Sequence, residues 1–163
     1  MDIERTVHPD QPAADQFARE QVSPKPIVMV NLLRFRERAD YSATGIDAEP
    51  ASGKEAYERY GRAVVKLLWR EGGQLLWAGN VRTALVAPSY ERWDQVALVY
   101  YPSRAAFVRM VSSEEYRKII GHRTAALEDS RLIETRPSRL PKLVLAASRL
   151  AARTWDRLRG RGR

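Results

Sequence analysis

The chain of 163 residues contains no cysteine, and this absence excludes disulfides, thiolate nucleophiles and cysteine ligands to a metal. Histidine is almost missing as well, because only His8 and His122 are present, too few for a histidine-rich metal centre. A metal site built from carboxylates around a single histidine finds no suitable spacing. We therefore expect no metal and no cofactor.

Several motifs with a known chemistry are also absent. The sequence has no glycine-rich dinucleotide or phosphate loop, no G-x-S-x-G elbow of serine hydrolases and no H-E-x-x-H zinc motif. Acid/base chemistry on a bound small molecule is what remains for an enzyme. Two function classes stay open, namely a cofactor-free enzyme and a protein that only binds its ligand.

Long apolar runs are lacking too. No uncharged stretch reaches the ~20 residues that a membrane-spanning helix needs. The start of the chain, from Met1 to Arg5, is polar and lacks the apolar run of a secretory signal. These features predict a soluble, cytoplasmic protein.

Positive charge, by contrast, is abundant but confined to one end. The net charge is +8, and residues 138–163 hold seven Arg and one Lys against Asp156 alone. The remainder of the chain is therefore close to neutral, and any attraction to anionic lipid or nucleic acid belongs to this tail. We expect the folded body not to bind nucleic acid.

The distribution of turn residues and apolar spacing predicts one domain between two appendages. Residues 1–25 form an N-terminal arm with a short helix that packs through Phe17, the domain spans residues 26–137, and residues 138–163 form a basic tail. The elements predicted in the domain are a strand over 26–35, a helix from a capping box at Ser52 and Glu55 to Gly72, a strand over 74–87 broken by a bulge or turn near Gly79, a strand over 95–101, a helix capped by Ser103, a helix begun at residues 112–115, and a strand over 130–135. This β-α-β-β-α-β order predicts an α+β, ferredoxin-like sandwich with an antiparallel sheet.

Two of these strands are apolar on both faces, over residues 27–33 and 96–101. Helices cover only one face of such a sheet, so the other face needs a second cover. A second copy of the chain packed face to face is the economical solution, and we expect a homodimer. A charge at Ala97 or Val99, whichever faces away from the helices, is then expected to dissociate it. The alternative is a monomer whose own tails fold over that face.

A series of segments in order also resembles a known family. The segments are Val28-Met29-Val30-Asn31-Leu32-Leu33-Arg34-Phe35, Gly53-Lys54-Glu55-Ala56-Tyr57-Glu58-Arg59-Tyr60-Gly61, Trp93-Asp94 and Tyr101-Pro102-Ser103. From about Pro9 to Pro137 the chain is similar to DUF1330, a family of unknown function within the dimeric α/β-barrel superfamily. The resemblance implies the fold, the dimer and a cavity between sheet and helices. The wider superfamily includes cofactor-free monooxygenases, cyclases and small-molecule-binding proteins, so the resemblance does not choose a reaction.

Polar residues that interrupt apolar patterns are the candidate site. Asn31 lies in an apolar strand, where its amide either orients a ligand carbonyl or bonds a neighbouring loop. Tyr57 and Tyr60 lie three residues apart on the apolar stripe of one helix, where their hydroxyls point into a cavity or they form ordinary core.

A second pair lies on the helix that precedes the last strand. Arg123 shares the apolar stripe of that helix, so it reaches the surface, pairs with Asp94 or Asp129, or binds an anionic group of the ligand. His122 is suited to general acid or base catalysis by its near-neutral pKa, although such a residue can also be purely structural.

Together these residues predict a small, largely apolar ligand between sheet and helices, for binding alone or for an acid/base reaction of monooxygenase, isomerase or cyclase type. The predicted catalytic residues are His122 and Tyr60. The predicted ligand-binding residues are Asn31, Tyr57, Tyr60, Trp93, Tyr116 and Arg123.

The tail predicts a further partner. From Pro141 onward, apolar residues gather on one side of a helical projection, with arginines on or beyond the other and Trp155 near the end. A basic amphipathic helix of this kind suits an anionic membrane surface and would make the protein peripheral to a membrane. Its apolar side can instead dock on the body of the protein, and nucleic acid is a third alternative.

Overall fold

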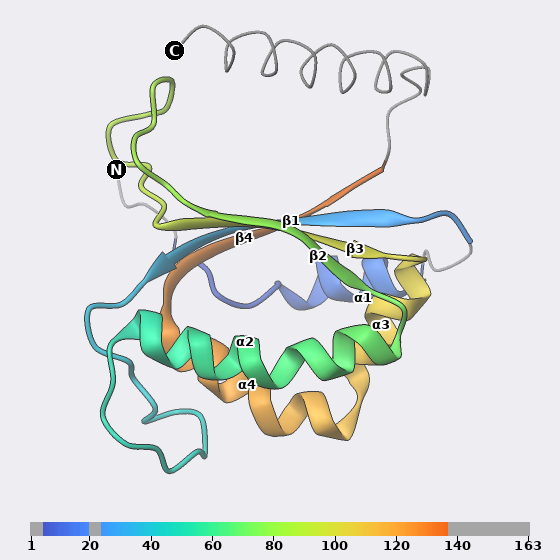
Figure 1. Cartoon of the computed structure of the whole chain (residues 1–163), viewed down its shortest axis with the longest axis horizontal. Coiled ribbons are helices and arrows are strands. Elements are labelled where there is room, and N and C mark those ends of the chain that lie inside the picture. Colours follow the sequence, from blue (N-terminus) through green and yellow to red (C-terminus); the bar gives the residue numbers. More distant parts are fainter. Residues whose placement is uncertain (1–4, 20–23, 137–163) are drawn as a thin grey trace, which may run out of the picture.

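A computed structural model describes residues 5–19 and 24–136, which form one antiparallel sheet with all helices on one face (Figure 1). The elements are α1 (Gln11–Arg19), β1 (Ile27–Phe35), α2 (Gly53–Arg70), β2 (Gln74–Asn80), β3 (Gln95–Tyr101), α3 (Arg104–Ser112), α4 (Glu114–Ala126) and β4 (Leu127–Thr135). The strand order is β2-β3-β1-β4. This arrangement confirms the predicted α+β, ferredoxin-like class.

The starts of three helices follow from serine caps. Ser52 forms the predicted capping box with Glu55, because its hydroxyl accepts the Glu55 amide at 3.2 Å and the Glu55 carboxylate accepts the Ser52 amide at 2.8 Å. Ser103 caps α3 and Ser113 caps α4 through the hydroxyl alone, which accepts the amide of Ala106 and of Tyr116, respectively. Beyond α2, Gly72 has a φ of +74°, which a side chain would disfavour.

Two strand boundaries differ from the sequence prediction. β2 ends at Asn80, not at residue 87, because Asn80 already pairs with Gln95, the first residue of β3. The irregularity in β2 lies between Leu75 and Trp77, before the predicted break. β4 begins at Leu127, three residues earlier than predicted, and Leu127 is fully buried. The prediction missed this start because the acidic residues Glu128 and Asp129 are not typical of a strand.

The helix-facing side of the sheet carries two apolar clusters. The first cluster contains Ile27, Met29, Leu68, Tyr101 and Met110, and Phe17 of α1 packs against it as predicted. The second cluster contains Leu33, Ala56, Ala126 and Leu127. Because side chains alternate along β1, Asn31 lies on this side between Met29 and Leu33. The core is therefore divided at the point where the polar residue interrupts β1.

The opposite side of the sheet carries no helix among the described residues (Figure 1). Trp77, Leu98, Val30 and Ile133 are paired in register from strand to strand and form an apolar row across it. Ala97 and Val99 face the helices instead, since Ala97 is buried and Val99 packs on the first cluster. The expectation that one of these two faces outward is therefore wrong, because Leu98 and its even-numbered neighbours occupy that side.

The predicted C-terminal tail over residues 138–163 lies outside the described residues, so the domain boundaries and the tail helix stay predictions. Within residues 5–19 and 24–136, no helix has the length and apolar character needed to cross a membrane.

Candidate functional site

Three tyrosines from two helices meet above the sheet. Tyr57 and Tyr60 come from α2 and Tyr116 from α4. The hydroxyl oxygens of Tyr60 and Tyr116 are 3.3 Å apart, and the ring centroids of Tyr57 and Tyr60 are 5.5 Å apart. Tyr60 is buried, with 9% of its surface exposed, whereas the other two are partly buried. We call Tyr57, Tyr60 and Tyr116 the tyrosine cluster.

The environment of Tyr57 and Tyr60 keeps both phenols protonated. Burial raises the pKa of Tyr57 to about 12, and burial together with the neighbouring Tyr116 holds the pKa of Tyr60 well above its ordinary value. The positive charge of Arg123 opposes both shifts without cancelling them. At neutral pH the hydroxyls of Tyr57 and Tyr60 therefore act as hydrogen-bond donors and acceptors, not as bases.

Asn31 bonds to the backbone of the sheet. Its amide nitrogen lies 3.3 Å from the Met29 carbonyl oxygen and 3.5 Å from that of Ala97. Both contacts are at the long end of the hydrogen-bond range. The sequence left two roles open for the Asn31 amide, a contact to a ligand or a hydrogen bond to a neighbouring loop. The observed contacts are closer to the second role, although the acceptors are strand carbonyls and not a loop.

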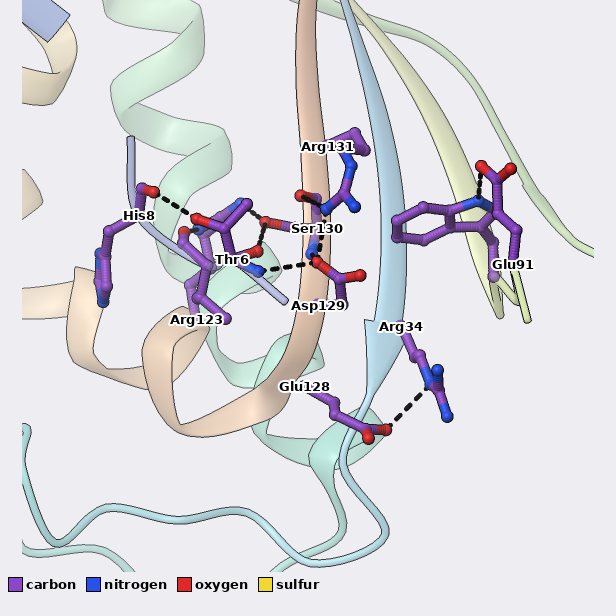
Figure 2. A network of polar contacts seen from close by, with 11 residues as sticks. Thr6, His8, Arg34, Glu91, Arg123, Glu128, Asp129, Ser130 and Arg131 are labelled. Atoms are coloured by element: carbon purple, nitrogen blue, oxygen red, sulfur yellow. Dashed lines mark hydrogen bonds and ion pairs between the residues drawn. The ribbon is translucent and has the colours of Figure 1, made fainter. Parts of the chain in front are cut away.

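Arg123 connects α4 to the N-terminal residues and to β4. Its guanidinium donates to the Val7 carbonyl oxygen at 2.9 Å and to the Ser130 hydroxyl at 3.1 Å (Figure 2). Asp129 instead accepts from the Thr6 amide and from Arg131. Arg123 is therefore satisfied by uncharged oxygens rather than by a carboxylate.

His122 is paired with a residue that sequence analysis missed. The Tyr41 hydroxyl lies 2.9 Å from Nδ1 of His122, and the two rings meet edge to face. Burial, and next the charge of Arg59, lower the pKa of His122 below its ordinary value, so the imidazole is neutral at pH 7. Tyr41 comes from the long connection between β1 and α2.

A signal for this contact was present in Gly121. A Cβ atom on Gly121 would lie 2.6 Å from Cδ1 of Ile46, so the glycine lets the connection approach α4. A glycine in the middle of a predicted helix indicates such a close approach.

Trp93 lies apart from the other predicted site residues. Its indole nitrogen donates to Glu91 at 2.9 Å, and the guanidinium of Arg131 lies 5.2 Å from its ring centroid. Arg131 pairs with Leu32 on the side of the sheet that faces away from the helices. Figure 2 accordingly shows Glu91 and Arg123 on opposite sides of β1.

A pocket of about 610 Å³ lies at one end of the sheet and contains none of the predicted site residues. It is lined by Phe35, Arg36, Glu37, Lys54, Asn80, Arg92, Asp94 and Glu128. Within the described part of the chain, no group of three or more His, Asp or Glu residues is arranged to hold a metal ion.

Comparison with known proteins finds similarity of the chain to a family without an assigned function. Residues 50–135 match the family described as Domain of unknown function (DUF1330). The crystal structure of RPA0582, a protein of unknown function from Rhodopseudomonas palustris, is 38% identical, with a TM-score of 0.75 over 83% of this chain and 99% of that chain. The methylated form of RPA0582 gives a TM-score of 0.77 at 38% identity, over 85% of this chain and 99% of that one.

More distant structures are similar as well. One is a dimeric protein of unknown function with a ferredoxin-like fold from Bacteroides fragilis, at 10% identity and a TM-score of 0.44, which covers 69% of this chain and 96% of that chain. No curated protein matches the chain.

Proposed function

This chain belongs to the DUF1330 family, and from that premise we propose that it is a homodimeric protein that binds a small, largely apolar ligand between the sheet and its helices. The tyrosine cluster is the proposed contact surface, and Asn31 and Arg123 are further proposed contacts of the ligand. The observation that carries the proposal is the convergence of three phenols from α2 and α4 within an otherwise apolar layer.

The hydrogen-bond capacity of the cluster is not exhausted by the protein. The Tyr60 and Tyr116 hydroxyls have two hydrogens between them and use one for their mutual bond. The Tyr57 hydroxyl makes no hydrogen bond to any described residue, yet it is not sealed from solvent. A ligand carbonyl or hydroxyl would satisfy these groups, and the surrounding rings would contact its apolar part.

An acid/base reaction is the catalytic form of this proposal. The neutral imidazole of His122 is the candidate base, because the tautomer that donates from Nδ1 to Tyr41 leaves Nε2 free to accept a proton. Tyr60 is the candidate acid or hydrogen-bond donor, since its raised pKa keeps the proton on its oxygen. Binding without turnover needs only the tyrosine cluster.

Native mass spectrometry of the purified protein tests the proposal. We expect a co-purified small molecule that is lost from the Tyr57→Phe and Tyr60→Phe double variant. Tyr90→Phe is the matched control, because Tyr90 lies on the exposed loop between β2 and β3. Retention of the molecule in the double variant, or equal loss in the control, would reject the tyrosine cluster as the site.

Once the molecule is identified, His122→Gln separates the two forms of the proposal. An enzyme loses turnover while it still binds, whereas a binding protein shows no turnover before or after the change.

The homodimer is supported by the apolar row across the free side of the sheet. Trp77 and Ile133, at its two ends, are 54% and 48% exposed in the single chain. An apolar surface that crosses all four strands is unfavourable in water. A second copy of the same surface would cover it.

A second role is recruitment to an anionic membrane through residues 138–163. The observation that favours it is the concentration of seven Arg and one Lys in this segment. Co-sedimentation with anionic and neutral vesicles tests it. We expect binding to anionic vesicles alone, weakened by salt and lost when the chain is truncated after residue 137, whereas equal indifference to both vesicle types would reject the role.

A further inference from the structure

We propose that the pocket at the end of the sheet binds the oxyanion group of a small organic molecule, a carboxylate or a phosphate. This site is separate from the tyrosine cluster and shares no residue with it. Its basic side chains come from three places in the sequence, namely Arg36 after β1, Lys54 in the first turn of α2, and Arg92 before β3.

The three basic side chains have few interactions with the rest of the protein, and the charge of Arg36 is only the last of the causes that lower the pKa of the exposed Asp40. The structure shows no side-chain hydrogen bond or ion pair between a described residue and Arg36, Lys54 or Arg92. Nε of Arg36 is moreover buried without a hydrogen bond. A buried donor of a charged group is costly when it is unpaired, so this atom favours an acceptor that the described chain does not supply.

The acidic residues of the pocket are mostly engaged elsewhere. Asp94 accepts the Phe35 amide through one carboxylate oxygen at 2.7 Å. Glu128 pairs with Arg34 at 2.9 Å (Figure 2) and also with Arg5. The third acid, Glu37, is exposed. The amide leaves the charge of Asp94 in place, so the three cations face two carboxylates without an ion-pair partner, Asp94 and Glu37, and the excess is one positive charge.

Backbone contacts bring together the chain segments that carry two of the three basic residues. The Gly53 amide donates to the Arg36 carbonyl oxygen at 3.1 Å, and the Arg36 amide donates to that of Ala126 at 2.9 Å. A Cβ on Gly53 would lie 2.4 Å from the Arg36 carbonyl oxygen, so only glycine permits this approach. Arg36 thus lies against the first turn of α2, where Lys54 follows and the helix dipole adds positive potential.

The size and lining of the pocket define the class of ligand. The pocket is open to solvent, and its volume of about 610 Å³ leaves room for an organic molecule larger than a single inorganic ion. Phe35 adds an aromatic ring and Asn80 adds an amide to the lining. These features suit an organic acid or a phosphate ester whose anionic group contacts the arginines.

Amide chemical-shift titration of the full chain with sodium phosphate and with sodium benzoate tests the proposal. Ionic strength is held constant with sodium chloride, because added salt alone screens surface charges. We expect saturable shifts centred on Arg36, Lys54 and Arg92, and the anion with the lower Kd identifies the preferred oxyanion.

Variants make the test specific. Arg92→Gln and Arg36→Gln should each raise the Kd at least tenfold, whereas Arg62→Gln, the same change at an exposed position of α2, should leave it unchanged. Arg92 is exposed, so its variant is expected to fold even if that of Arg36 does not. Shifts that do not saturate, that spread over the whole surface, or that respond equally to all three variants would overturn the proposal.

Discussion

Arg104, the first residue of α3, shows how a single charged side chain is accommodated in the interior. The residue is 7% exposed, and its guanidinium forms two hydrogen bonds with the Glu134 carboxylate, at 2.6 and 3.0 Å. The ring of Phe17 covers it at 4.5 Å. The partner charge and the ring together offset the loss of water, and they connect α1, α3 and β4 at one point.

The first prediction at this scale concerns Glu134→Gln. The substitution removes the carboxylate charge that accepts two hydrogen bonds from a buried guanidinium, so we expect the free energy of unfolding at pH 7 to fall by about 2–3 kcal/mol. Glu58→Gln, at an exposed position of α2, is the control. Chemical denaturation measures both, and an equal effect in the two variants would contradict the structural role of the pair.

The pH dependence of the same pair has a definite sign. Hydrogen bonding to Arg104, before any other cause, lowers the pKa of Glu134 below 4.5, its ordinary value. A carboxylate with a lowered folded-state pKa stabilises the protein above its ordinary pKa and loses that contribution as the pH falls through the lowered value. The difference between wild type and Glu134→Gln should therefore persist down to pH ~4.5 and shrink below it.

A second prediction concerns His122. Its pKa should lie below 6.5 because of burial and the charge of Arg59, and Arg59→Gln should raise it. The chain has two histidines, so the imidazole resonances of His122 and His8 can be followed together by NMR as the pH is varied. A pKa of His122 at or above 6.5 in the wild type would remove the argument for a neutral base at pH 7.

At the scale of elements, the start of α2 shows how sequence-local and long-range contacts combine. The capping box of Ser52 and Glu55 is local and begins the helix. The contact of Gly53 with the backbone of Arg36 and Ala126 is long-range, and it joins the start of α2 to the end of β1 and the end of α4.

Two glycines of α2 give a matched prediction. Gly53→Ala places a Cβ within 2.7 Å of three backbone atoms. Because backbone atoms cannot move aside easily, we expect the free energy of unfolding to fall by at least about 2 kcal/mol. Gly61→Ala places its Cβ in open space within the same helix and should stabilise the protein by about 0.5–1 kcal/mol. Thermal denaturation distinguishes the two, and effects of the same sign would contradict the packing at Gly53.

At the scale of the whole molecule, the free side of the sheet governs assembly. Leu98 and Val30 are paired at the centre of the apolar row, and Trp77 and Ile133 flank them on the outer strands. A charge at the centre of this surface would be buried by any face-to-face partner.

Leu98→Glu is therefore expected to dissociate the proposed dimer, at a cost of several kcal/mol. Light scattering at micromolar concentration should give twice 18.6 kDa for the wild type and 18.6 kDa for the variant. Lys66→Glu, on the exposed side of α2, is the control for the change of charge. A monomeric wild type, or a variant that stays dimeric, would reject the face-to-face arrangement.

The sequence by itself determined the elements whose signals are local. Serine caps, β-branched runs and apolar stripes act over three to four residues, so they predicted β1, α2, β3 and α3 and the β-α-β-β-α-β order. The positions of Tyr57 and Tyr60 on one face of α2 followed from helical spacing in the same way.

Only the tertiary structure decided the features that depend on a partner far along the chain. β2 ends at Asn80, whose partner Gln95 is the first residue of β3. The apolar residues after Asn80 favour a longer strand in the sequence, so this end could not be predicted. Tyr41 meets His122 across 81 positions of sequence, and Arg123 meets Val7 across 116. The separation of Trp93 from the tyrosine cluster likewise depends on which face of the sheet the helices cover, because strand alternation assigns residues to two faces without saying which is inside.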